Sequence, residues 1–217
     1  MQNCHVILTA SITGGPVAQL VEHRTFNAMV ARSTRAGLTN TLSFHRSIGM
    51  YQQTRRYIEE RLHVHPRIAV VLGSGLGDFA AELTETVEMP YADIPGWPRS
   101  TAVGHAGKFI AGKLDGTPLI VLAGRAHLYE GYSPGRVVYA MRILHLLGVK
   151  QMVLTNAAGG INLTYSQGAL VLVSDHINLQ GVNPLSGANE YDFGPRFPDM
   201  SEAYSKEYRE IALHVAA

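Results

Sequence analysis

The stretch Arg67-Ile-Ala-Val-Val-Leu72, followed at once by Gly73-Ser-Gly-Leu-Gly77, sets the fold class. An unbroken apolar run rich in branched side chains is typical of a strand buried on both faces of a sheet. Upstream of it, Tyr57, Ile58 and Leu62 recur at helical spacing among Arg and Glu. A helix, a buried strand and a glycine-rich turn in this order predict an α/β domain.

Further strands and a well-bounded helix continue the alternation. Ser133 and Pro134 are typical of an N-cap and a first helical position, and an apolar stripe then runs to Gly148. The pattern of residues 202–217 is also helical. We expect a mixed, mostly parallel central sheet flanked by helices, with its site at the carboxyl ends of the strands. The other strand candidates are Lys108–Leu114, Pro118–Leu122, Gln151–Leu154 and Ala169–Val173.

Composition excludes several classes of protein. The chain has 217 residues, 46% of them hydrophobic, which is enough for a buried core and rules out disorder throughout. A formal charge of +1 gives no support for nucleic acid as a partner, and no apolar run approaches the ~18 residues of a membrane span. The single cysteine, Cys4, cannot form an internal disulfide, and no Cys/His cluster has zinc-site spacing. We therefore expect a cytoplasmic protein without a bound metal.

Residues 1–49 differ from the rest, and we expect them to lie outside the domain. They are rich in Ser and Thr, nearly free of acidic residues, and without a sustained helical or strand period. An organelle transit peptide, a disordered tail, and a peptide translated from DNA opposite a tRNA gene are the three open origins. The stretch Gly15–Asn27 favours the last of these, with true initiation at Met50 and a domain over residues 50–217.

The glycine-rich turn Gly73–Gly77 is the first candidate for binding an anion. Its glycines let backbone amides approach a ligand, and Ser74 adds a hydroxyl donor. The dinucleotide fingerprint fails because Asp78 stands where its last glycine belongs, and no Walker lysine follows. An NAD-binding module is thereby disfavoured, and a plain tight turn remains the alternative.

The segment Gly124–Tyr132 is the second candidate. Arg125 and His127 are two residues apart after a strand, so both side chains leave the same face of an extended chain. A guanidinium and an imidazole together suit a dianionic phosphate, and Tyr129 continues the face with a hydroxyl for a sugar. The alternative is a solvated arginine beside a surface histidine.

The segment Thr155–Gly160 is the third candidate. Its small side chains would let the backbone amides of Asn156 and Ala157 contact a ligand, although a tight strand exit explains them equally. His105, within Gly104–Gly107, is either a mobile further donor or a loop histidine without a ligand. The three candidate segments each follow an apolar strand, and one shared anion site explains them better than three separate coincidences.

Two other polar or aromatic segments call for a structural interpretation. We interpret Asp175-His176 as polar packing, because adjacent residues on a strand face opposite ways. Phe193–Met200 is broken by prolines and rich in aromatic residues, and it either seals a pocket or interface or plugs the core. The sequence shows no nucleophile elbow, catalytic cysteine or metal-ligand set. The candidate residues are donors to an anion, with no protein nucleophile among them.

Together these motifs resemble purine nucleoside phosphorylases of the trimeric class, from about Tyr51 to the last residue. The segments that carry the resemblance are Gly73–Gly77, Pro98–Thr101, Gly104–Gly107, Gly124–Tyr132, Thr155–Asn162, Asp175–Leu179, Asn183–Leu185 and Arg196–Tyr204. It implies a nucleoside phosphorylase fold and a homotrimer. It also implies that Tyr129 contacts ribose and that Phe197 reaches the sugar pocket of a neighbouring subunit. The phosphate ligands it implies are Ser74, Arg125, His127, Asn156, Ala157 and His105.

The resemblance implies a reaction that needs no cofactor, with inorganic phosphate as co-substrate. Phosphate attacks C1′ of a purine ribo- or deoxyribonucleoside and yields the free base and (deoxy)ribose 1-phosphate. The protein contributes positioning and electrostatic stabilisation. This implies a role in purine salvage.

The C-terminal end departs from the family pattern. The Gly-Pro-x-Phe-Glu segment and the residues that hold the purine are not found before Ala217, so the purine site stays unassigned and we expect a truncated chain. Methylthioadenosine phosphorylase is a second enzymatic interpretation. A non-catalytic remnant that binds phosphate or joins a trimer is a third, and base preference is not determined.

Overall fold

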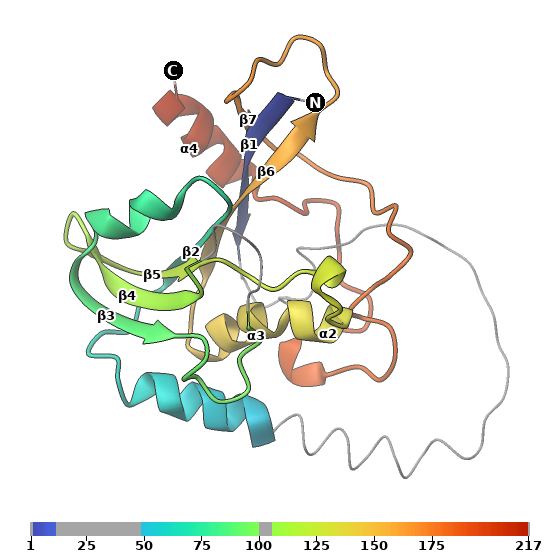
Figure 1. Ribbon diagram of the computed structural model, residues 1–217. Coiled ribbons are helices and arrows are strands. Elements are labelled where there is room, and N and C mark those ends of the chain that lie inside the picture. Colours follow the sequence, from blue (N-terminus) through green and yellow to red (C-terminus); the bar gives the residue numbers. More distant parts are fainter. Residues whose placement is uncertain (1, 12–48, 100–105, 217) are drawn as a thin grey trace, which may run out of the picture.

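A computed structural model describes residues 2–11, 49–99 and 106–216 (Figure 1). Its centre is a seven-stranded mixed sheet in the order β3-β4-β5-β2-β6-β1-β7. The strands are β1 (Gln2–Ser11), β2 (Ile68–Leu72), β3 (Thr84–Pro90), β4 (Lys108–Leu114), β5 (Thr117–Ala123), β6 (Gln151–Gly160) and β7 (Leu170–Leu172). A helix over residues 49–59 lies between β1 and β2 in the chain. The later helices are α2 (Pro134–Val137), α3 (Tyr139–Leu146) and α4 (Lys206–Ala216), with 3-10 turns η2 (Gly77–Glu82), η3 (Leu128–Glu130) and η4 (Tyr191–Phe193). The predicted α/β class with a mixed sheet is confirmed.

Three neighbouring strands, β5, β2 and β6, form the parallel centre of the sheet. Leu72 of β2 lies opposite Ala123 of β5, and Val71 lies opposite Leu154 of β6. Strands β2 and β5 therefore end at the same edge of the sheet, and β6 runs past it. This is the edge at which ligands bind in open α/β folds.

Strands β3, β4 and β5 form an antiparallel meander. The β4–β5 connection is the pair Asp115-Gly116, with φ of 47° and 77°. Positive φ at both central residues is the signature of a type I′ hairpin turn, which Asp-Gly favours. The β4–β5 hairpin thus follows from local turn chemistry.

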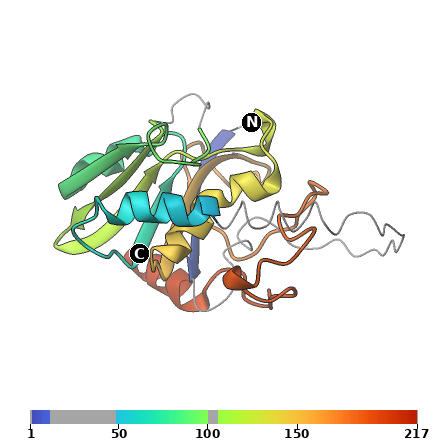
Figure 2. The same ribbon diagram turned by 90° about the horizontal axis from the view of Figure 1, so that it is seen from below.

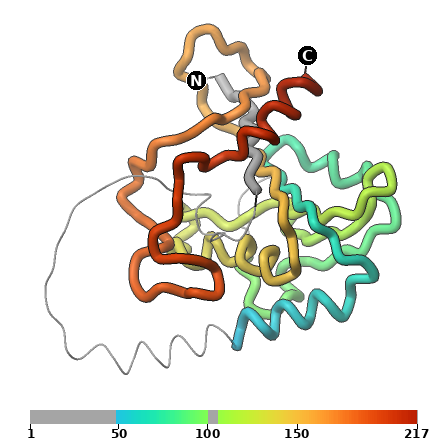
Figure 3. Tube along the Cα trace, turned by 180° about the vertical axis from the view of Figure 1, so that it is seen from behind, coloured from blue at the N-terminus to red at the C-terminus, as the bar shows by residue number. Residues whose placement is uncertain are grey.

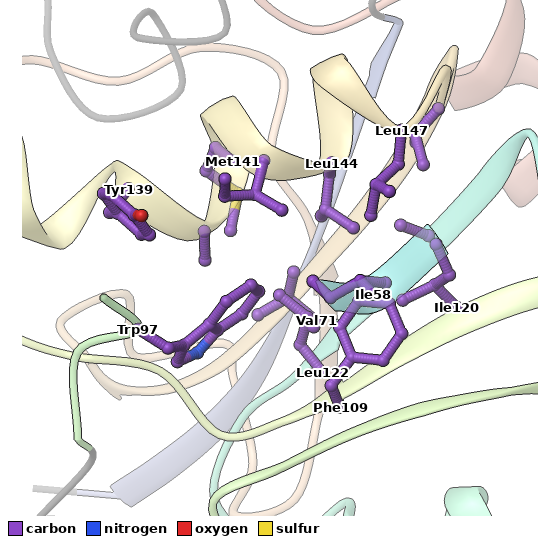
Figure 4. Close-up of a cluster of buried hydrophobic side chains, with 14 of the residues drawn as sticks. Ile58, Val71, Trp97, Phe109, Ile120, Leu122, Tyr139, Met141, Leu144 and Leu147 are labelled. Atoms are coloured by element: carbon purple, nitrogen blue, oxygen red, sulfur yellow. The ribbon is translucent and has the colours of Figure 1, made fainter. Parts of the chain in front are cut away.

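One face of the sheet is covered by the helix over residues 49–59 together with α2 and α3 (Figures 1 and 2). Figure 4 shows Met141 and Leu144 on α3 pointing towards Val71 and Leu122 of the sheet. Ile58, from the first helix, is fully buried in the same cluster. The other face packs Leu72, Ile110 and Val121, among others, against residues of η2. Burial on both faces explains why β2, and β5 after Thr117, consist of apolar residues.

The predicted helix after Ser133 is divided into α2 and α3 at Val138, whose ψ is 0°. The amide of Val138 donates to Pro134 O, and the amide of Arg142 donates to Val138 O. These bonds keep the helical i to i−4 pattern across the junction, so the apolar stripe stays on one face. The C-terminal helix begins at Lys206, four residues later than its pattern suggested.

Strand β1 differs from the expectation that residues 1–49 contribute nothing to the domain. It pairs antiparallel with β6 and parallel with β7, which places it inside the sheet. Backbone pairing of this kind satisfies the open edge of a neighbouring strand and leaves no trace in side-chain periodicity. Residues 12–48 lie outside the described part of the chain, and their place outside the domain stays a prediction.

Between β6 and α4 the chain has little regular structure. Figures 1 and 3 show this segment running from the end of β6 past α2 to η4 and back to α4 beside the sheet. Its two regular elements are β7 and η4. Strand β7 is a shorter form of the predicted strand Ala169–Val173. This segment carries the Phe193–Met200 loop.

Candidate functional site

Thr155, the fifth residue of β6, is hydrogen-bonded to residues at the carboxyl ends of β2 and β5. Its Oγ1 accepts a hydrogen bond from the amide of Gly73, at 2.9 Å, and donates one to Val71 O, at 3.0 Å. Its carbonyl accepts a hydrogen bond from Nη1 of Arg125, at 2.7 Å. The glycine-rich turn and the predicted arginine are therefore brought to one residue.

Gly73 makes a close backbone contact at this point. A Cβ atom on Gly73 would lie 2.5 Å from Cα of Asn156 and 2.7 Å from O of Thr155. Such distances exclude any side chain, so glycine is required here. Ser74 follows directly and is exposed at the sheet edge, as a donor to a ligand must be.

Arg125 is half-buried, directly after β5. Burial lowers the pKa of its guanidinium below the ordinary value, while the neighbouring Tyr129 and Tyr91 act in the opposite direction. The hydroxyl of the buried Tyr91 donates to Gly124 O, at 2.7 Å, and so holds the backbone from which Arg125 projects. Burial also raises the pKa of Tyr91, which keeps this hydroxyl a donor.

His127 and Tyr129 lie side by side. Their rings stack with centroids 4.7 Å apart and planes 13° apart. The backbone amide of His127 donates to Oε1 of Glu130, at 2.7 Å. The prediction that Tyr129 continues an extended chain is wrong, because it lies in η3; the turn folds the 77% exposed tyrosine back onto His127.

Asn156 and Ala157 occupy a different backbone environment from the expected turn. Both continue β6, opposite Val6 and His5 of β1. The expected strand exit at residue 155 is therefore wrong, and the reason is the added partner strand, which extends β6 to Gly160. Asn156 still lies against Gly73, within the candidate site.

Two predicted site residues remain, His105 and Phe197. His105 lies outside the described residues. Phe197 is 87% exposed in the segment after η4. Its neighbour Arg196 donates to Leu185 O and Gly187 O, at 2.8 and 2.6 Å, which closes the loop behind Phe197.

A cavity of about 280 Å³ lies next to the site without containing it. Gly73 and Gly124 line it, but Ser74, Arg125 and His127 do not. Its charged lining includes the Lys108–Glu88 ion pair, at 2.8 Å. Hydrogen-bond geometry at the strand ends, and not this cavity, defines the candidate site.

Sequence reasoning missed Thr155 and Tyr91 as members of the site. The sequence did offer a signal for Thr155, which is the one hydroxyl side chain in the segment Thr155–Gly160 and directly follows an apolar run. The segment was singled out only for the small size of its side chains. Tyr91 gave no such signal, because it comes from a different part of the chain. Asp175 and His176 lie beyond the end of β7 at Leu172, so the strand argument for them is wrong. The polar packing of His176 is supported, since its Nδ1 bonds the hydroxyl of Tyr204, at 2.5 Å.

The side chains of residues 49–99 and 106–216 bear on metal binding and on membrane insertion. Within these ranges no three His, Cys, Asp or Glu side chains gather closely enough to hold a metal ion. None of the helices there has the length and apolar character to cross a membrane.

Comparison with known proteins identifies the family. The model of the phosphorylase superfamily matches residues 67–217. The chain belongs to the phosphorylase superfamily. Within it, the chain is similar to purine nucleoside phosphorylases, which confirms the resemblance found in the sequence motifs.

Three relatives illustrate this similarity. Purine nucleoside phosphorylase 1 of Geobacillus stearothermophilus is 47% identical over 165 residues, covering 76% of this chain and 60% of its own length. Purine nucleoside phosphorylase of Rattus norvegicus is 44% identical over 167 residues, covering 76% and 58%. A crystal structure of isoform 2 of the Schistosoma mansoni enzyme, in complex with cytosine and ribose-1-phosphate, matches with a TM-score of 0.72 and 39% identity, covering 77% and 60%. The chain thus spans about 60% of the length of the relatives it matches.

Proposed function

We propose that this protein is a purine nucleoside phosphorylase. It cleaves the N-glycosidic bond of purine ribo- and deoxyribonucleosides with phosphate, giving the free base and (deoxy)ribose 1-phosphate. The observation that carries the proposal is the meeting of Gly73 and Arg125 at Thr155, on the sheet edge where the sequence predicted an anion. The relatives, at 44–47% identity, support it and favour it over methylthioadenosine phosphorylase.

The reaction requires hydrogen-bond donors from the protein and no protein nucleophile, because phosphate itself is the attacking group. An oxygen of phosphate forms the new bond to C1′ while the bond to the purine nitrogen breaks, and the electron pair leaves with the base, which takes a proton. The guanidinium of Arg125 and the donors of the glycine-rich turn hold the phosphate dianion against the developing positive charge on the sugar. Holding both reactants in line removes much of the entropic barrier.

The remaining roles follow the resemblance. Ser74 and His127 bind phosphate beside Arg125, with His105 as a further donor and with Asn156 and Ala157 on the side of the site formed by β6. Tyr129 contacts the ribose. No cofactor takes part.

We also propose a homotrimer, in which the exposed Phe197 completes the sugar pocket of a second copy of this chain. A cytoplasmic role in purine salvage fits this activity. The size of the assembly in solution, measured by light scattering, tests the oligomeric state, and a monomer at all concentrations would contradict it.

The activity is tested directly by incubating the full chain with inosine and phosphate and measuring hypoxanthine. Product should form only when phosphate is present. Folded protein that forms no hypoxanthine contradicts the proposal. Phosphate binding without turnover would support the non-catalytic alternative.

Replacing Arg125 with Ala should abolish the stabilisation by phosphate, because the main cationic donor is lost. Saturating phosphate at about 100 times its Kd should stabilise the wild-type chain by about 2.7 kcal/mol, which thermal melting detects. Arg55→Ala is the matched control, since Arg55 loses the same charge from an exposed helical ion pair with Glu59. A phosphate shift that persists unchanged in Arg125→Ala would place the anion elsewhere.

A further inference from the structure

We propose that Thr155 is a positioning residue that holds the Gly73 turn and Arg125 as one unit. The inference rests on the proposed phosphate site and adds to it a residue that does not touch phosphate. Thr155 is buried, with 6% of its surface exposed, so it acts through the groups that it binds.

The hydroxyl of Thr155 continues the hydrogen bonding between β6 and the end of β2, beyond the last backbone pair of the two strands. The parallel pairing of β2 with β6 ends at Val71 opposite Leu154. One residue further on, Oγ1 of Thr155 accepts from the amide of Gly73 and donates to the carbonyl of Val71. The side chain therefore spans the last residue of β2 and fixes the point at which the turn leaves the sheet.

The hydroxyl has little freedom in this arrangement. A threonine hydroxyl has a single proton, and donating it to Val71 O leaves the oxygen lone pairs to accept from Gly73. Both bonds lie in a buried environment, where hydrogen bonds are stronger and water does not readily replace them. The rotamer of Thr155 and the orientation of the Gly73 amide are thus set together.

The backbone of the same residue orients the arginine. Nη1 of Arg125 donates to O of Thr155, at 2.7 Å. A Cβ atom on Gly73 would lie 2.7 Å from this same oxygen, so the glycine-rich turn also packs against it. A shift of Thr155 would move the guanidinium and the glycine-rich turn together. Thr155 of β6 therefore sets the distance between the phosphate donors that follow β2 and the one that follows β5.

The test compares two substitutions that differ in the hydroxyl group. Thr155→Val keeps the branched shape and removes both hydrogen bonds, whereas Thr155→Ser keeps the hydroxyl. Thr54→Val is the matched control, because the hydroxyl of Thr54 is also fully buried and binds Met50 O and the hydroxyl of Tyr139. If Thr155→Val does not fold, Thr155→Cys, a weak donor and acceptor of similar size to Ser, replaces it.

Two measurements are made on the full chain with inorganic phosphate as the probe. The first is the KM for phosphate, with Kd from calorimetry. The second is the hydrogen-exchange rate of the Gly73 amide, by NMR. For Thr155→Val we expect the KM for phosphate to rise about tenfold, equivalent to about 1.4 kcal/mol. The kcat at saturating phosphate should change much less, and Gly73 should exchange at least several times faster.

The controls separate positioning from general stability. Thr155→Ser should restore both values, and Thr54→Val should lower the melting temperature without changing either. An unchanged exchange rate of Gly73 in Thr155→Val, or an equal increase in Thr54→Val, overturns the inference. If the wild-type chain fails to bind phosphate while only Thr155→Val releases the Gly73 amide, the coupling stands and the proposed function fails.

Discussion

Gly73 and Gly77 bound the same turn but have different structural demands. Gly73 lies against the backbone of β6, where a Cβ would come within 2.5 Å of Asn156 Cα. Gly77 has open space within 4 Å of the same hypothetical atom. The glycine pattern in the sequence is therefore required at its first position by close backbone packing.

Gly73→Ala should destabilise the fold by about 2–3 kcal/mol, as overpacking against backbone does, and should remove phosphate binding. Gly77→Ala, the matched control, should change the free energy of unfolding by no more than about 0.5 kcal/mol. Urea unfolding followed by the fluorescence of Trp97 measures both. Equal effects of the two variants would show that the contact with β6 is not made.

Helix α3 connects distant parts of the chain through Arg142. This buried arginine donates to the hydroxyl of Tyr51, at 2.7 Å, and to Oε1 of Glu190, at 2.6 Å. Its guanidinium carbon lies 5.1 Å from the ring centre of Phe193 in η4. Arg142 therefore holds together the first helix, α3 and the start of the Phe193–Met200 loop.

Arg142→Met should lower the free energy of unfolding by about 3 kcal/mol, because it leaves a largely buried carboxylate at Glu190 without its cation. The loop should also loosen, so that trypsin cuts faster after Arg196. Lys113→Met is the control, since its pair with Glu85 is largely exposed and should contribute about 0–1 kcal/mol. If Arg142→Met were no more destabilised than this control, the cluster would not hold the loop.

The sheet contains one strand, β1, that the sequence pattern did not predict. Strand β1 fills the position between β6 and β7, with register running from Gln2 opposite Gly160 to Ser11 opposite Gln151. The helical layer and the parallel centre were predictable from apolar runs. The position of β1 was not, because pairing involves backbone groups that every residue carries.

Deleting residues 1–11 should lower the melting temperature and promote aggregation, because the edge of β6 loses its partner. Val6→Pro should act in the same direction, since proline removes a backbone donor from a strand interior. Differential scanning calorimetry and light scattering measure the two effects. Unchanged behaviour of the shortened chain is the result expected from the sequence pattern, and it would show that β1 contributes nothing to stability.

Local patterns were sufficient for much of the fold and for part of the site. The apolar run before Gly73 and the strand β4 are each encoded within a few neighbouring residues, and the structure has them where the sequence placed them. Ser74, Arg125 and His127 were identifiable as donors because each follows an apolar strand. The sequence motifs also sufficed for the resemblance to purine nucleoside phosphorylases.

The joining of these donors around Thr155 was decided in three dimensions. Hydrogen bonds from Gly73 and Arg125 to one residue require β2 to lie between β5 and β6, and strand order is a property of the folded sheet. The same holds for the extension of β6 by β1. Periodicity reports how a segment meets its immediate surroundings, whereas contacts between segments far apart in the chain depend on which elements become neighbours.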